Sequence, residues 1–387
     1  MAPLLRIGSR SLPGAGHGAV RDDSRAAARG YSRGTGQGTG VRAGRDRGRG
    51  ARSLLAALAL AVPLATGCSS VPVTGRAASP APSAQHPSEQ KGAATSSPVL
   101  RQTPDQIART SASIRQLDDL PMYEMTFDGG YDAEAPLTED ELARKADGWA
   151  CSLFLRGTEF GRNFDWDPNP AIVVRADPPD GYASLSIADA SYLLGSSAAP
   201  DLSDPVQRRR LGHAVLAPFD GMNEKGLAVG LATTPTAELP APMPDRPTLG
   251  SVRIMRVLLD RAATVKEALA LMRTYNVDFT GGPQVHYLIV DKSGDSAVVE
   301  YGKGRMNVVE DRVLTNWSVV SGTPDDRHTR LTRTIDSKTD GLELLKSVAQ
   351  GHTRWSVVYD LAAGTARLVT GKRWGKVHTL SLARPQE

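Results

Sequence analysis

The chain has 387 residues, with 46 Lys or Arg against 42 Asp or Glu and a formal net charge of +4. The first hundred residues are rich in Gly, Arg, Ala, Ser and Pro, and the arginines up to Arg52 supply much of the positive excess. The rest is nearly balanced and lacks a basic patch with interleaved aromatics, which argues against a nucleic-acid partner.

Residues 1–68 have the layout of an export signal that ends in a lipidation site. Arginines precede the apolar stretch 54–62, which is too short for a transmembrane helix, and small residues then lead into Cys68. We expect Cys68 to be lipidated and to anchor the exported protein to the outer face of the cytoplasmic membrane. The alternative is an ordinary signal peptide that happens to contain a cysteine, and it also predicts export.

Residues 69–102 are rich in Ser, Pro and Ala, which predicts a disordered tether. From about Thr103 the apolar runs suffice for one large core. A helix is expected over 103–117, with Thr103 at its start, then a strand over 121–127 and a short helix over 138–146. Residues 103–150 are therefore expected to form a propeptide or small subunit that packs against a catalytic domain at 151–387.

The catalytic domain is predicted to alternate groups of strands with groups of helices. A β-hairpin is expected around Cys151, with polar groups in its second strand. Further strands are expected at 171–175, 182–187, 213–218, 226–233, 285–290, 296–301, 306–315, 355–360, 365–370 and 376–382. Helices are expected at 248–275, split near 263–264, at 325–337 and at 341–348. This order predicts an α+β fold built as a layered sandwich.

Several sequence blocks occur in the order of a known enzyme family. They are CSLF at 151–154 with GRNFDW at 161–166, then DGMNEKGL at 220–227, LTN at 314–316 and TRWSVVYD at 353–360. The chain thereby resembles the N-terminal-nucleophile amide hydrolases of the choloylglycine hydrolase and penicillin V acylase family. PPDGY at 178–182 resembles its linear amide C–N hydrolase subgroup. The resemblance covers roughly Met122 to the C-terminus and implies a four-layer αββα sandwich, the Ntn-hydrolase fold.

Cys151 is one of two cysteines, and with Cys68 lipidated it has no disulfide partner in the chain. A thiolate is a strong nucleophile, and the α-amine of an N-terminal cysteine can accept its proton. An α-nitrogen inside a peptide bond cannot act as a base, so this chemistry requires self-cleavage between Ala150 and Cys151. The alternative is a buried core cysteine, since free Cys is among the most buried residue types.

Arg162 and Asp165 lie on the strand that returns past Cys151. A cationic neighbour lowers the pKa of a thiol, and Asp165 offers an acceptor for the α-ammonium group. The resemblance places both residues in the catalytic set. Without it, an ordinary ion pair at a strand edge would be the favoured explanation.

Two asparagines and an arginine complete the candidate site. Asn223 and Asn316 match family blocks that contribute asparagines, and uncharged donors of this kind stabilise the oxyanion formed when an amide is attacked. Asn223 also suits a turn, because Asn-Glu-Lys-Gly is a turn sequence. The family's last catalytic arginine falls at a helix start, where Arg327 matches best and Arg330 lies one turn away.

These features predict a self-processing amidohydrolase that cleaves linear, non-peptide C–N bonds of small N-acyl substrates through an acyl-Cys151 intermediate. No metal-ligand motif, P-loop or dinucleotide fingerprint occurs, so no cofactor is expected; a homo-oligomer is compatible with the sequence. Acyl transfer to an amine and a catalytically silent ligand-binding lipoprotein are the alternatives. A Cys–His enzyme is the mechanistic rival, and its candidate histidines are His213, His286, His328, His352 and His378.

Overall fold

The computed structural model describes residues 99–135 and 150–383, all within the compact unit His86–Glu387. The signal region with Cys68, nearly all of the tether and the helix expected over 138–146 lie outside the described residues. Within the described ranges, no helix is both long and apolar enough to cross a membrane.

Nine strands form the larger sheet, in the order β15-β14-β13-β10-β9-β8-β7-β3-β2. Its neighbours are antiparallel except for the parallel pair β3 and β7. Strand β10 is buried along its whole length, as expected for an apolar run covered on both faces. The strands are β2 (Arg115–Asp118), β3 (Met122–Phe127), β7 (Ala171–Ala176), β8 (Ser184–Asp189), β9 (Asp220–Asn223), β10 (Leu227–Thr233), β13 (Val285–Asp291), β14 (Ser296–Gly302) and β15 (Arg305–Val309).

Six strands form the second sheet, in the order β16-β5-β6-β17-β18-β19. They are β5 (Ala150–Arg156), β6 (Glu159–Asp165), β16 (Val313–Leu314), β17 (Thr353–Asp360), β18 (Thr365–Thr370) and β19 (His378–Ser381). The two sheets pack face to face, with β5 and β16 against β10 and β13. A Cβ on Gly230 of β10 would lie 2.5 Å from Leu153 Cδ2, so the glycine permits this close approach.

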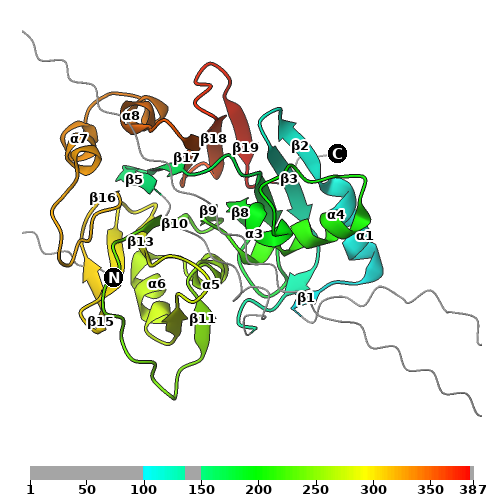
Figure 1. Ribbon diagram of the computed structural model, residues 1–387, viewed down its shortest axis with the longest axis horizontal. Helices are drawn as coiled ribbons and strands as arrows, with labels where there is room; N and C mark the ends of the chain where they lie inside the picture. Colours follow the sequence, from blue (N-terminus) through cyan, green and yellow to red (C-terminus); the bar gives the residue numbers. More distant parts are fainter. Residues whose placement is uncertain (1–98, 136–149, 384–387) are drawn as a thin grey trace, which may run out of the picture. The chain divides into compact units, whose positions relative to one another are not determined.

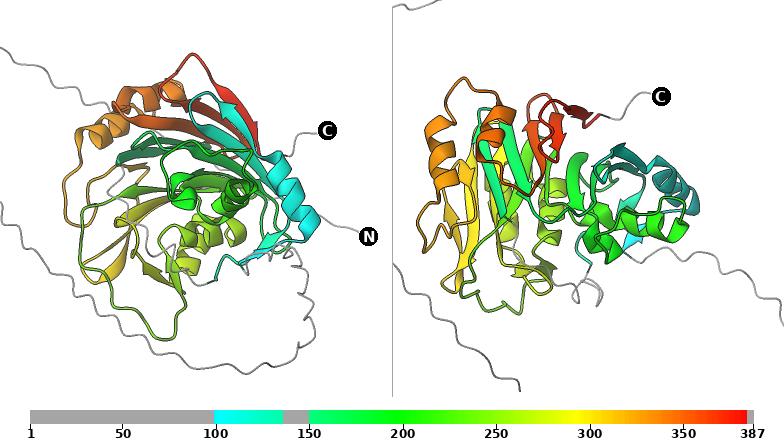
Figure 2. Two further views of the ribbon diagram at one scale, coloured as in Figure 1. Left: turned by 45° about the vertical axis from the view of Figure 1, so that its right-hand side comes forward. Right: turned by 45° about the horizontal axis from the view of Figure 1, so that its top comes forward.

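Helices cover the outer face of each sheet (Figures 1 and 2). Helices α5 (Arg253–Arg261) and α6 (Val265–Met272) pack on β9, β10 and β13 of the larger sheet. Helices α7 (Asp326–Thr334) and α8 (Gly341–Val348) pack on β16, β5, β6 and β17 of the smaller one. The order helix, sheet, sheet, helix confirms the predicted αββα sandwich.

The segment before Cys151 contributes to the larger sheet. Helix α1 (Pro104–Ser113) begins with a capping box at Thr103 and packs on β3, which lies between β2 and β7. Two short two-stranded sheets pair β1 (Leu100–Arg101) with β4 (Gly130–Tyr131) and β11 (Thr248–Gly250) with β12 (Asn276–Asp278). The division of the chain into a small subunit and a catalytic domain stays a prediction.

Four predicted elements differ from the structure, and one of them is the helix expected from 248, because 248–250 is strand β11 and α5 begins at Arg253. The strand expected at 213–218 is wrong. Residues 213–216 instead form the 3-10 helix η1 (His213–Leu216), whose apolar side chains enter the core. This helix follows the helices α3 (Ser191–Leu194) and α4 (Pro205–Gly212). The first helix ends at Ser113, and 115–118 is strand β2. The strand expected at 306–315 is two strands, β15 and β16, in different sheets.

Candidate active site

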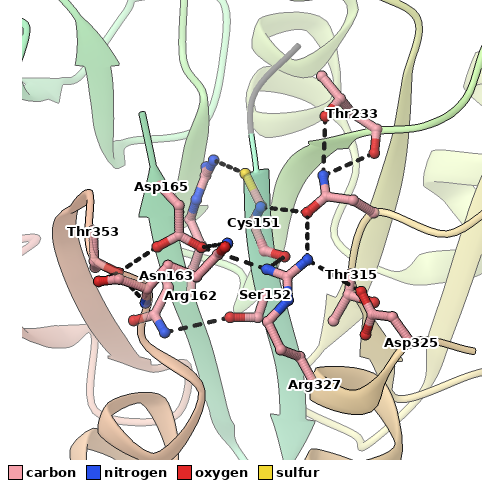
Figure 3. Close-up of polar contacts among 12 residues, drawn as sticks. Cys151, Ser152, Arg162, Asn163, Asp165, Thr233, Thr315, Asp325, Arg327 and Thr353 are labelled. Carbon is pink, nitrogen blue, oxygen red and sulfur yellow. Dashed lines mark hydrogen bonds and ion pairs between the residues drawn. The ribbon is translucent and has the colours of Figure 1, made fainter. Parts of the chain in front are cut away.

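Cys151 is the second residue of β5, and its side chain is fully buried. Each of its three polar atoms contacts a different predicted site residue (Figure 3). Arg162 Nη2 donates to Sγ at 3.3 Å, the main-chain N–H donates to Asn316 Oδ1 at 2.7 Å, and the main-chain oxygen accepts from Arg327 Nη1 at 2.9 Å. The structure thus brings these four residues together.

The register of the β5–β6 hairpin explains how Arg162 reaches the thiol. Cys151 lies opposite Phe164, and Arg162 is two residues before Phe164 on the same face of β6. Such diagonal neighbours are within reach of a long side chain. The face they share points toward the larger sheet, where Arg162 meets Asp220 of β9.

Arg162 is held as a fully buried cation. Its Nη1 donates to Asp220 Oδ2 at 2.7 Å and to the Phe219 carbonyl at 2.6 Å. Its guanidinium also lies over the Phe164 and Trp355 rings. Burial alone would lower the pKa of Arg162, but the neighbouring Cys151 and Asp220 outweigh burial and raise it. The guanidinium therefore stays charged beside the thiol.

Burial raises the pKa of the Cys151 thiol above its ordinary value, while Arg162 acts in the opposite direction. In the chain with an intact Ala150–Cys151 bond, the thiol is therefore neutral at pH 7. Arg162 lies where it would stabilise a thiolate once a base removes the proton. The arrangement thus sets a fixed cation beside a neutral thiol.

Asp165 and Arg162 lie on different faces of β6. In the β5–β6 register, Asp165 pairs with Ala150 and not with Cys151. Its carboxylate accepts hydrogen bonds from Thr353 Oγ1 and from Gln350 Nε2, the latter at 2.8 Å. Arg327 Nη1 lies 3.5 Å from Asp165 Oδ2, so Arg327 links this carboxylate to Cys151. Burial raises the pKa of Asp165 against the effect of these hydrogen bonds.

Asn316 follows β16 and has a fixed amide orientation. Its Nδ2 donates to the main-chain oxygen and to Oγ1 of Thr233, each at 2.9 Å. Its Oδ1 is thereby turned toward the Cys151 N–H and also accepts from Arg327 Nη2 at 2.9 Å. Thr233 has no distinguishing feature in the sequence, because it ends the apolar run of β10 and carries no charge.

Of the two candidate arginines, Arg327 and Arg330, it is Arg327 that contacts Cys151 and Asn316. It stands in the first turn of α7, whose N-cap Asp325 accepts from His328 N–H and also contacts Arg327 Nη2 at 3.1 Å. Arg330 instead donates to the Ser347 carbonyl in α8, at 2.7 Å.

The side chain of Asn223 forms hydrogen bonds with main-chain groups of other segments and not with Cys151. Its Nδ2 donates to the carbonyl of Leu259 in α5 and to the carbonyl of Ala262, the residue that follows α5. Its Oδ1 accepts from the N–H groups of Lys225 and Leu227. These contacts are those of a turn residue that ties β9 to α5. Of the six predicted catalytic residues, Asn223 is the one whose contacts do not join it to Cys151.

Three candidate histidines of the Cys–His alternative are engaged with carboxylates. His286 contacts Glu300, His328 contacts Asp311, and His378 contacts Asp118. The hydrogen bond to Cys151 Sγ comes from Arg162. This geometry favours an arginine-assisted thiol over a Cys–His pair.

Comparison with protein families matches residues 212–320 to the linear amide C–N hydrolases, choloylglycine hydrolase family. An uncharacterized protein of Paramecium bursaria Chlorella virus 1 is 32% identical over 100 residues, which are 24% of this chain and 36% of that protein. The chain thus spans about a third of the length of the curated relative it matches. The match confirms the predicted resemblance to this family over residues 212–320.

Solved structures with a similar arrangement include three hydrolases. A conjugated bile acid hydrolase from Clostridium perfringens is 16% identical, with a TM-score of 0.44 over 61% of this chain and 93% of that one. A penicillin V acylase from Agrobacterium tumefaciens is 17% identical (TM-score 0.38; 61% and 80% covered). A Caenorhabditis elegans ortholog of N-acylethanolamine-hydrolyzing acid amidase is 16% identical (TM-score 0.35; 55% and 92% covered).

Proposed function

Because residues 212–320 match the linear amide C–N hydrolases of the choloylglycine hydrolase family, we propose that this chain is a self-processing amidohydrolase with Cys151 as its nucleophile. The observation that carries the proposal is the contact of the Cys151 nitrogen, oxygen and sulfur with Asn316, Arg327 and Arg162 respectively. A core cysteine has no need of a side-chain partner on each polar atom.

Processing begins with attack of Sγ on the Ala150 carbonyl carbon. The C–N bond to Cys151 breaks, the acyl group passes to sulfur, and the thiol proton ends on the departing nitrogen. Water then hydrolyses the thioester, which leaves a carboxylate on Ala150 and a free thiol and α-amine on Cys151. Asn316 Oδ1 already accepts from this nitrogen, so it holds the new amine in place.

In turnover, the α-amine takes the thiol proton while Arg162 stabilises the thiolate. The thiolate attacks the amide carbonyl of the substrate, and the α-ammonium group returns the proton to the leaving amine. Water, deprotonated by the α-amine, then resolves the acyl-Cys151 thioester and releases the carboxylic acid. Arg327 and Asp165 fix the main chain of Cys151 throughout.

The substrate class that we propose is a small N-acyl amide. Conjugated bile acids, penicillin V and N-acylethanolamines are the compounds named for the hydrolases of similar structure, and they share an acyl group joined to a small amine.

Incubation of wild type with glycine-conjugated bile acid, penicillin V and an N-acylethanolamine tests this proposal. It predicts release of the free amine from at least one of them, together with an acyl adduct on the Cys151 peptide by mass spectrometry. The Cys151→Ala variant should show neither. Equal release by both proteins would contradict the assignment of Cys151.

We also propose that the protein is exported and held at the membrane through Cys68, as the apolar stretch 54–62 and the small residues that lead into Cys68 suggest. Partition of the wild type into a detergent phase and of Cys68→Ala into the aqueous phase would support the anchor. Aqueous partition of both would count against it.

A further inference from the structure

The segment 315–319, which carries Asn316, is held at both ends by two buried residues of the larger sheet. His286 on β13 and Glu300 on β14 are both fully buried. Tyr287 pairs with Val299 in the antiparallel register, so His286 and Glu300 occupy the next opposed positions. The two side chains lie on one face of the sheet, and His286 Nδ1 lies 3.0 Å from Glu300 Oε2.

His286 holds the beginning of the segment and Glu300 holds its end. His286 Nε2 lies 2.7 Å from the Thr315 carbonyl oxygen. Glu300 Oε2 accepts from the Val319 N–H at 2.9 Å, and Glu300 Oε1 accepts from Ser318 Oγ. The segment therefore leaves β16 and turns past Cys151 between two fixed points.

The neighbours of His286 and Glu300 restrict which of their atoms can donate and which can accept. The Thr315 carbonyl can only accept, so His286 Nε2 carries a proton. Glu300 Oε2 meets two groups, the Val319 N–H and His286 Nδ1. A glutamine in place of Glu300 could be oriented in two ways. Its NH2 group would face the Val319 N–H, so that two donors meet, or its oxygen would face an unprotonated His286 Nδ1, so that two acceptors meet. Each arrangement loses one buried hydrogen bond.

We propose that His286 and Glu300 are a positioning pair for Asn316, and that through Asn316 they orient the nitrogen of Cys151. The inference rests on the proposed function, because the orientation matters only if that nitrogen becomes the catalytic base. Neither side chain touches the thiol. Their effect passes through the main chain of Thr315 and Val319 to the Asn316 amide, whose Oδ1 accepts from Cys151 N–H at 2.7 Å.

Hydrogen exchange measured by mass spectrometry tests the positioning directly and needs no substrate. The proteins are wild type, His286→Gln and Glu300→Gln, with Ser318→Ala as a milder variant that removes one bond to Glu300. Exchange over residues 313–320 should rise by about tenfold in the first two variants, since a buried group loses its partner. Peptides of α5 and α6 should exchange as in wild type.

Tyr287→Phe is the matched control. Tyr287 is the next residue on β13, is fully buried, and donates from its hydroxyl to the Ser251 carbonyl at 2.6 Å. The variant therefore also loses one buried hydrogen bond to a main-chain oxygen, but away from segment 315–319. Exchange over 313–320 should stay at the wild-type level.

Activity provides the second readout. For a processed enzyme and a substrate found to be hydrolysed, the pair variants should lower kcat by about tenfold with KM little changed, because a misplaced base slows chemistry rather than binding. Unchanged exchange over 313–320 in the pair variants, or faster exchange throughout the domain, would overturn the inference. A wild type that neither processes nor turns over would instead contradict the proposed function, while the exchange result still decides on the pair.

Discussion

Arg162 Nη2 lies 3.3 Å from Cys151 Sγ, while Nη1 of the same guanidinium is bound by Asp220 Oδ2 at 2.7 Å. Asp220 is fully buried and also accepts from Trp355 Nε1 and the Tyr359 hydroxyl. The cation at the thiol is therefore fixed from behind by a carboxylate on the other sheet. The position of this guanidinium at the Cys151 thiol depends on the packing of the two sheets.

Replacing Asp220 by Asn should strongly destabilise the protein. The substitution leaves the buried Arg162 charge without its partner, and breaking a buried pair in this way costs about 3–5 kcal/mol. The measurement is urea unfolding beside Asp336→Asn, whose carboxylate forms an exposed ion pair with Arg312. Exposed pairs contribute little, so the control should resemble wild type. Equal stability of the two variants would contradict the account.

Two of the three arginines of α7, Arg327 and Arg330, should differ sharply on substitution by Lys. Arg327 uses Nη1 and Nη2 on the Cys151 oxygen and on Asn316 at once, which a single ammonium group cannot reproduce. Arg327→Lys should slow processing by about tenfold or more, since two charge-assisted bonds are affected. Arg330→Lys should process at the wild-type rate. A comparable loss in both variants would mean that α7 as a whole, rather than Arg327, matters.

Stability at acid pH should depend on Glu300. Burial raises the pKa of Glu300, but hydrogen bonds from His286 and Ser318 outweigh it, and the net shift is downward. A carboxyl group with a lowered pKa in the folded state stabilises the protein above its unfolded pKa of about 4.3, and this contribution is lost as pH falls through the folded value. The unfolding free energy of wild type relative to Glu300→Gln should therefore decrease below about pH 4.3. A difference that does not change with pH would refute this assignment.

Cleavage before Cys151 should not release the preceding segment. Strand β3 pairs with β7 from Met122 opposite Ala171 to Phe127 opposite Ala176, and Arg175 binds the largely buried Glu124. Both fragments should co-elute in native size-exclusion chromatography and separate only in denaturant. Separation under native conditions would show that these contacts do not suffice.

The sequence predicted the layers of the fold better than the path of the chain between them. Helices α6 and α8 and strand β18 appear where apolar spacing placed them, because each buries a single stripe or run. The strand expected at 213–218 instead follows α4 as a 3-10 helix, because an apolar run buried on all sides has no diagnostic period. The exchange of sheets between β15 and β16 depends on tertiary packing, which local patterns do not report.

The candidate site was predictable as far as sequence blocks reach. Cys151, Arg162, Asp165, Asn316 and Arg327 lie in one connected set of contacts. Asn223 matched a block but serves a turn, since a turn asparagine and a site asparagine are identical in sequence. The contacts of Thr233 with Asn316 and of Asp220 with Arg162 emerge only in the structure, because each joins residues far apart in the chain.

The most direct test of the account is the intact mass and N-terminal sequence of the purified protein beside Cys151→Ala. We expect a fragment of the wild type that begins at Cys151 and is absent from the variant. The same fragment in Cys151→Ala would assign the cleavage to another protease. A single wild-type chain with the Ala150–Cys151 bond intact would leave Cys151 without a free α-amine, and would contradict the proposed mechanism.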